Sequence, residues 1–221
     1  MLWGRAALLL VIPIVALSVI GGRSFLSAQL LREVAFGNDA RVEQLLRVGA
    51  DPNARDMGLV PLGHRGEPAL VRAAALGESR IVRALLLKGA DVAALDVVGR
   101  SALSYAACED RLETVRLLLD TGADANDSSS WIPALQGAVA RDHERVVELL
   151  LRSGADPNRV FDNGMTPLGL AIKRGSLRSA EVLIKRGARV DLPDGEAPES
   201  AARSLGDALL RKYERRVEGP R

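Results

Sequence analysis

Cysteine and histidine are the side chains of this protein whose chemistry could support catalysis or metal binding. The chain has one cysteine, Cys108, and two histidines, His64 and His143. A cysteine nucleophile needs a base and an orienting group; His143 could be the base, but no third member is apparent. His64 has no nearby cysteine or histidine with which to share a metal. We therefore expect no catalytic residues, no metal and no cofactor, with His143 structural and His64 facing solvent or a partner.

The balance of charge narrows the class of partner. The chain has 30 basic and 28 acidic residues, and the two signs are interspersed over residues 141–145. Proteins that bind nucleic acid usually concentrate basic residues on one face, so we expect no nucleic-acid partner. Apolar residues make up 48% of the chain and aromatic residues only 3%. The core must therefore consist mainly of Leu, Val, Ile and Ala, which suits closely packed helices.

The N-terminal region is set apart by its hydrophobicity. Residues 6–22 contain no charge, and Arg5 and Arg23 lie at the two ends of this run. As a helix it would rise about 25 Å, slightly less than the roughly 30 Å hydrocarbon core of a bilayer. One interpretation is an uncleaved single-pass anchor; the other is an export signal cleaved near the small residues Ala16 and Ser18, which are separated by one residue. The flanking charges are similar, so the side of the membrane occupied by the rest of the chain stays open.

The tripeptide Gly-Ala-Asp recurs along the rest of the chain at intervals of about 33 residues, with one interval of about 40. Four copies and a degenerate fifth begin at Gly49, Gly89, Gly122, Gly154 and Gly187. Apolar residues seven, four and three positions before each glycine share one face of a helix. A Gly or Asp twelve positions before each glycine predicts a turn that separates this helix from an earlier one.

The earlier helix of each unit has a register of its own. A leucine lies seven positions before the turn residue, namely Leu30, Leu70, Leu103, Leu135 and Leu168. A small residue lies four positions before the turn in four units, and it lets two helices approach closely. Glu33 takes that place in the first unit, as expected of a terminal repeat with no predecessor to pack against.

This unit resembles the ankyrin repeat, which has about 33 residues, two short helices and a β-turn, and begins with Thr-Pro-Leu-His-x-Ala. Residues 166–171 read Thr-Pro-Leu-Gly-Leu-Ala and match that start except at His. The resemblance covers residues 30 to about 197. It implies an all-α repeat solenoid of about five stacked helix-turn-helix repeats with β-turn fingers, preceded by a hydrophobic N-terminal helix. It also implies that His143 bonds locally to the backbone.

We therefore divide the chain into a hydrophobic segment (1–28), an ankyrin-like domain (29–197), and a C-terminal capping helix with a tail (198–221). Apolar residues at i, i+4 spacing predict that last helix from Pro198 to about Arg216. The longer interval places its extra residues within 57–66, a stretch rich in Gly and Pro that we expect to be an enlarged loop.

The resemblance further implies a binding surface, because ankyrin repeats usually meet partners through the turn tips and the exposed face of the first helices. Residue-by-residue transfer gives the tips as Val97, Val98, Arg100, Trp131, Asp162, Asn163 and Met165. It gives the first-helix positions as Leu76, Cys108, Glu109, Arg141, Lys173 and Arg174. Trp and Arg are frequent binding hot spots, although Trp131 could instead pack against its turn, which is one residue short. Arg80 falls outside this face.

A stacked helical array offers a long shallow surface rather than a desolvated cleft, so we expect a binding protein, not an enzyme, with no small-molecule substrate. Our first hypothesis is a membrane-tethered scaffold or adaptor that binds another protein through the concave surface of a monomeric repeat domain. The membrane would be a bacterial inner membrane, because the excess of Arg over Lys and the abundant Ala and Gly are typical of GC-rich genomes. The alternative is an exported, periplasmic accessory or inhibitor protein released by signal cleavage.

Overall fold

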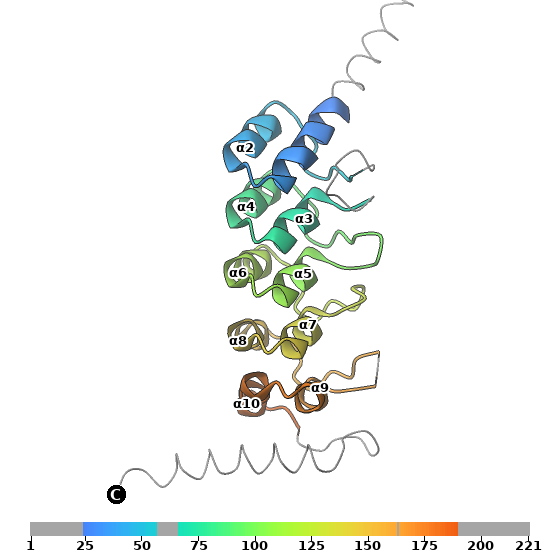
Figure 1. Ribbon diagram of the computed structural model, residues 1–221, viewed down its shortest axis with the longest axis vertical. Coiled ribbons are helices and arrows are strands. Elements are labelled where there is room, and N and C mark those ends of the chain that lie inside the picture. The colour runs from blue at the N-terminus through green and yellow to red at the C-terminus, as the bar shows by residue number, and fades with distance from the viewer. Residues whose placement is uncertain (1–23, 57–65, 163, 190–221) are drawn as a thin grey trace, which may run out of the picture.

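The computed structural model describes residues 24–56, 66–162 and 164–189, in which short helices stack in pairs along one axis (Figure 1). The described part of the chain is helical over residues 24–35. The helices that follow are α2 (Asp39–Arg47), α3 (Ala69–Leu76), α4 (Ser79–Leu87), α5 (Ala102–Cys108), α6 (Leu112–Asp120), α7 (Ala134–Ala140), α8 (Glu144–Arg152), α9 (Pro167–Arg174) and α10 (Leu177–Lys185). These helices confirm the predicted all-α repeat solenoid within the described ranges.

The helices form two rows (Figure 1). The first-helix row contains residues 24–35, α3, α5, α7 and α9, and the second-helix row contains α2, α4, α6, α8 and α10. Within each row, neighbours pack side by side, as α5 does on α3 and α7. The loops that join one pair to the next project on the side of the first-helix row. We call them fingers and number them in chain order: the second spans residues 91–101, the third 124–132 and the fourth 156–165.

Side-chain caps set where the first helices begin. Pro167 opens α9, where its missing N–H removes no helical hydrogen bond. The hydroxyl of Thr166 accepts a hydrogen bond from the N–H of Gly169 at 3.1 Å. Ser101 caps α5 in the same way, by accepting from the N–H of Ser104. The start motif seen in the sequence is therefore a helix N-cap.

The turn inside each pair contains a residue with positive φ. Gly takes this position in three pairs, and Asp110 and Asp142 take it in the other two, with φ of 55° and 57°. Asp is one of the few residues besides glycine that adopts the left-handed conformation readily. All five are the turn residues that the sequence predicts, so the pattern of Gly and Asp reflects a backbone requirement.

The core lies between the two rows. All five predicted first-helix leucines are buried, and so are the small residues at Ala73, Ala106, Ala138 and Ala171. In the second helices the first leucine of each predicted pair is buried, and the second leucine is partly exposed in α4 and α6. Glu33 is half-buried and its carboxylate accepts a hydrogen bond from the amide of Asn38 at 3.1 Å.

The second finger contains the predicted β-turn. The N–H of Gly99 donates to the carbonyl of Asp96 at 3.1 Å, and Leu95 forms an isolated antiparallel bridge with Ser101. The carboxylate of Asp96 accepts from the N–H groups of Val98 and Arg100 at 2.9 and 2.8 Å. This local bonding gives the finger a fixed shape, although pairing in the described fingers is limited to isolated bridges.

Asparagine side chains join consecutive fingers. Asn53 donates from its amide to the carbonyl of Gly89 at 3.1 Å and accepts from the N–H of Asp91 at 2.8 Å. Asn126 and Asn158 make the same pair of bonds to the Gly-Ala tripeptide of the next repeat. Ala93 holds the equivalent position in the second finger and makes no such bonds. The junction between the second and third repeats therefore lacks this clamp.

Several predictions fall on residues outside the described ranges: the hydrophobic helix over residues 6–22, the enlarged loop over 57–65, Asn163, and the C-terminal helix over 198–216. Within the described ranges, no helix combines the length and the hydrophobicity that a transmembrane span requires. The helix over residues 24–35 continues past residue 28, where we placed the end of the N-terminal segment, and Leu26 packs against the repeat core.

Candidate partner-binding groove

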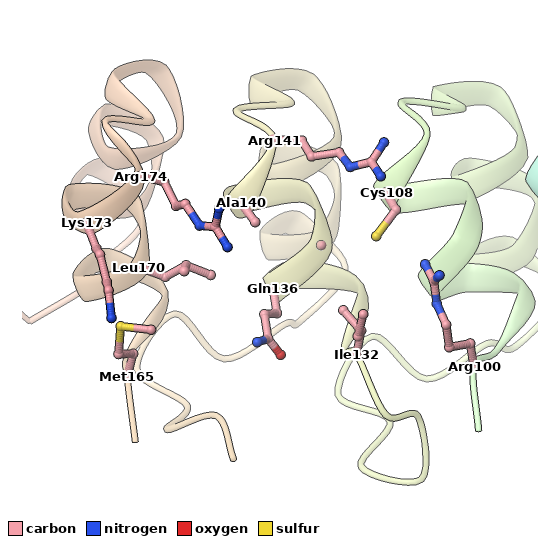
Figure 2. Close-up of a pocket in the computed structure, with 11 residues that line it drawn as sticks. Arg100, Cys108, Ile132, Gln136, Ala140, Arg141, Met165, Leu170, Lys173 and Arg174 are labelled. Atoms are coloured by element: carbon pink, nitrogen blue, oxygen red, sulfur yellow. The ribbon is translucent and has the colours of Figure 1, made fainter. Parts of the chain in front are cut away.

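A groove of about 510 Å³ opens on the first-helix row and draws its walls from three consecutive repeats (Figure 2). The residues that line it are Arg100, Cys108, Ile132, Gln136, Gly137, Ala140, Arg141, Met165, Leu170, Lys173 and Arg174. We call this surface the basic groove. Figure 2 shows α5, α7 and α9 presenting these side chains from successive layers of the stack. Six of the thirteen residues that we predicted for partner binding therefore lie together in one hollow.

Arg100 is fixed at one end of the basic groove. Its guanidinium carbon lies 3.8 Å from the centre of the Tyr105 ring, a cation–π contact. The Tyr105 hydroxyl donates to the Asp96 carboxylate at 2.8 Å, so the finger and α5 hold the pair together. Burial, then the hydrogen bond to Asp96, raises the pKa of Tyr105 to about 12, so the ring stays neutral over the physiological range.

Cys108 forms part of the groove wall and is not a candidate nucleophile. The residue is 5% exposed. Burial raises the pKa of its thiol, an effect that the positive charges of Arg100 and Arg141 offset only in part. His143 Nε2 lies 2.9 Å from the Cys108 carbonyl oxygen, which belongs to the preceding repeat. His143 therefore bonds to the backbone as expected, but the bond is not local: its imidazole joins two consecutive repeats.

The cations of the groove differ in how they are compensated. Arg141 forms an ion pair at 3.1 Å with Glu109, which belongs to the preceding repeat. Lys173 and Arg174 lie in the last turn of α9, where positive side chains are favoured by the helix dipole. Neither forms an ion pair with any residue of the described ranges. Two positive charges of the groove are therefore available to an external anion.

The finger tips beside the groove expose large apolar side chains. Val97 and Val98 at the tip of the second finger are 67% and 58% exposed, and Trp131 at the end of the third finger is 72% exposed. The alternative in which Trp131 packs into its shortened turn is therefore wrong for its side chain. Its backbone N–H donates to the carbonyl of Gly99 at 2.6 Å, which ties the third finger to the second.

Three other predicted residues lie outside the lining of the groove. Leu76 at the end of α3 is 40% exposed, and Glu109 and Asp162 are exposed at the surface, but none of the three lines the groove. Sequence reasoning missed Ile132, Gln136, Gly137, Ala140 and Leu170. The repeat register could have identified Ala140, because it lies two residues before the turn residue, as do Cys108 and Lys173.

A second hollow, of about 330 Å³, lies on the second-helix row. It is lined by α2 and α4, and it includes Arg80, Arg83 and Leu87. Arg80 pairs with Asp39 at 3.2 Å. The position of Arg80 away from the finger side agrees with its predicted exclusion from the binding face. Among the described residues, no group of three or more His, Cys, Asp or Glu side chains is placed to hold a metal ion.

Comparison with known protein families decides the class of this fold. A family model described as ankyrin repeats (3 copies) matches residues 30–129, and one described as ankyrin repeats (many copies) matches residues 135–184. Together the two matches cover most of the chain. The chain belongs to the ankyrin repeat family. Ankyrin repeats bind other proteins, so the array is a protein–protein interaction module.

The curated relatives share the ankyrin repeats and are longer proteins. The chain is 33% identical over 130 residues to the ankyrin repeat protein nuc-2 of Neurospora crassa, which covers 58% of this chain and 12% of that protein. It is 28% identical over 175 residues to a probable E3 ubiquitin-protein ligase, XBOS32, of Oryza sativa subsp. japonica. The matched region covers 78% of this chain and 33% of that protein. It spans a third or less of these two relatives, so the similarity concerns their ankyrin regions.

Within the ankyrin array the groove and the finger tips form one continuous candidate site. The tips of the second and third fingers are joined by the bond between Trp131 and Gly99, and Arg100 and Ile132 at the bases of these fingers line the groove. The apolar tips and the basic groove therefore lie on the same side of the stack, where one extended segment of a partner could contact both.

Proposed function

We propose that this ankyrin array binds a partner protein at a membrane, with the finger tips and the basic groove as the contact surface and residues 6–22 as the tether. The observation that carries the binding site is the exposure of Val97, Val98 and Trp131 on adjacent fingers. Large apolar side chains that gather on one exposed surface favour an interaction site, and Trp is among the strongest hot-spot residues.

The tether is supported by the uncharged run over residues 6–22, bounded by Arg5 and Arg23. Its length lies between that of an export signal and that of a full transmembrane span. The alternative is therefore an exported soluble protein that accompanies or inhibits one enzyme. Intact mass of the natively expressed protein separates the two: a chain that keeps residue 1 and stays in membranes washed at alkaline pH supports the tether. A chain that begins between about residues 18 and 28 supports export.

Affinity capture with the purified full-length protein, read out by mass spectrometry, tests the binding surface. We expect Val98→Asp and Trp131→Ala to lose the partner that the unchanged protein captures, because each removes apolar contact area at the tips. Both side chains are exposed, so the helical content and the melting temperature should hardly change.

Two control variants lie on the second-helix row. Leu87→Ala removes an apolar side chain that is 80% exposed on α4, and Arg80→Ala removes a cation on the same helix. Both should capture the partner as the unchanged protein does. Loss of the partner in these controls, with full capture by the tip variants, would assign the interaction to the opposite face.

A further inference from the structure

The basic groove concentrates positive charge on a chain that is nearly neutral. Its lining includes Arg100, Arg141, Lys173 and Arg174 and no acidic residue. The whole chain has 30 basic and 28 acidic residues, so this concentration is local and does not follow from composition. A surface lined by one sign of charge within a concavity strengthens its field and attracts ligands of the opposite sign.

These cations have unused bonding capacity. Lys173 and Arg174 form no ion pair with the described residues, and Nε of Arg100 is buried without a hydrogen-bond partner among them. The stacking of Arg100 on Tyr105 holds its guanidinium in place before any ligand arrives. A fixed guanidinium loses less freedom on binding a carboxylate, which it can hold through two parallel hydrogen bonds. An external anion would pair with Lys173 and Arg174, and the half-buried Arg100 would add its positive charge beside them.

The rest of the lining selects the kind of anion. Ile132 and Leu170 place apolar side chains between the cations, and Met165 lies beside Lys173 at the far end, as Figure 2 shows. No aromatic side chain lines the groove, whereas single-stranded nucleic acid is usually bound by aromatic stacking along a basic track. Alternating positive and apolar contacts match an extended peptide in which acidic residues flank an apolar one.

We propose that the basic groove binds an acidic segment of the partner protein, an inference that rests on the proposed function. Asp or Glu carboxylates of this segment pair with Arg100, Lys173 and Arg174. An apolar side chain of the same segment packs on the half-buried Ile132. Arg141, already paired with Glu109 at the rim, completes the positive wall. The finger tips supply affinity through apolar contact, and the groove supplies selectivity for acidic sequences.

Selection from a random twelve-residue peptide library displayed on phage, with the full-length protein as bait, tests this inference. We expect selected peptides to be enriched in Asp and Glu around an apolar residue. Synthetic copies should bind less tightly as salt increases, because the charges are partly exposed. Lys173→Gln with Arg174→Gln should weaken their binding by about tenfold or more. The matched control, Arg83→Gln with Arg116→Gln, removes two exposed cations of the second-helix row and should leave binding unchanged.

The other outcomes separate the two proposals. Enrichment of neutral apolar peptides that are lost with Trp131→Ala would keep the binding surface and overturn the acidic segment. No enrichment of any peptide would overturn both. Tighter binding of a twenty-nucleotide oligothymidylate, lost in the double variant, would assign the groove to nucleic acid. Preference for a synthetic peptide of residues 190–200, which include four acidic residues and no basic one, would assign it to the chain itself.

Discussion

Gly137 lies so close to Cys108 that a Cβ atom built on the glycine would overlap the cysteine sulfur. Glycine inside a helix costs about 1 kcal/mol relative to alanine. Its presence in α7 therefore marks a close approach of α7 to α5, and the packed contact with Cys108 offsets the loss of helix propensity.

Gly137→Ala should destabilise the array by about 1 kcal/mol in urea unfolding, because overpacking costs roughly 1–3 kcal/mol and the gain in helix propensity returns only about 1. Adding Cys108→Ala removes the overlap, so the double variant should be more stable than Gly137→Ala alone. Additive effects of the two changes would show that the residues do not press on each other.

Leu118 is fully buried in α6 of the central repeat. Leu118→Ala should reduce the free energy of unfolding by about 2–5 kcal/mol, the range for a large-to-small change in a packed core. Leu87→Ala on α4 is the matched control, since Leu87 is exposed, and it should change stability by less than about 0.5 kcal/mol. Equal effects in thermal melts would contradict the assignment of Leu118 to the core.

Ala93→Asn should stabilise the junction between the second and third repeats. Asn53, Asn126 and Asn158 each join two fingers through an amide that donates to a carbonyl and accepts from an N–H. Two such hydrogen bonds contribute about 1–2 kcal/mol net. Ala93→Asp is the control, because a carboxylate accepts from the N–H but cannot donate to the carbonyl. A melting temperature no higher for Asn than for Asp would exclude the clamp.

Asp142 should make the array sensitive to acid. Burial raises the pKa of its carboxyl group, but hydrogen bonds from Ser179 and Arg178 outweigh burial and hold the pKa below its ordinary value of 3.8. A folded-state pKa below the unfolded one gives stability that is present above about pH 4 and lost as pH falls through the folded pKa. Asp142→Asn should keep the left-handed turn and lower the free energy of unfolding at pH 7 by roughly 1 kcal/mol. The variant should also lose less stability than the unchanged protein as the pH falls below about 4.

The control for Asp142 is Asp162→Asn, an exposed carboxylate in the fourth finger that makes no hydrogen bond with the described residues. Its melting temperature should follow that of the unchanged protein from pH 7 to pH 3. If the unchanged protein and Asp142→Asn lose stability in parallel below pH 4, the carboxylate does not carry the acid response.

Much of the fold could be read from the sequence because the repeat register is a local property. The buried positions that Leu103 and Ala106 occupy in their repeat recur in the other repeats and follow from helical spacing. The turn residues, such as Asp110, follow from the requirement for positive φ. What the register could not give was how side chains from different repeats meet. The contact of Gly137 with Cys108 and the bond from His143 to the Cys108 carbonyl depend on the distance between consecutive helices, which is not encoded in the spacing.

The candidate site was predicted in outline for the same reason. When the binding positions of the family are transferred to this sequence, they include Arg100, Lys173 and Arg174. These three residues line the same groove. This transfer could not show that Glu109 forms an ion pair with Arg141 or that the Tyr105 ring stacks on Arg100. Both contacts depend on side-chain rotamers and on the conformation of a finger. The basic character of the groove therefore emerges only when the side chains are placed together.

The origin of the groove walls in three consecutive repeats has a consequence for cooperativity. Each repeat packs only on its neighbours, so an array of this kind can open from an end, one unit at a time. A segment lying across α5, α7 and α9 must leave before any of these units opens, which adds a link between the third and fifth repeats that the fold alone lacks. Occupancy would slow amide exchange in these three units together and leave the first two repeats to open at their own rate.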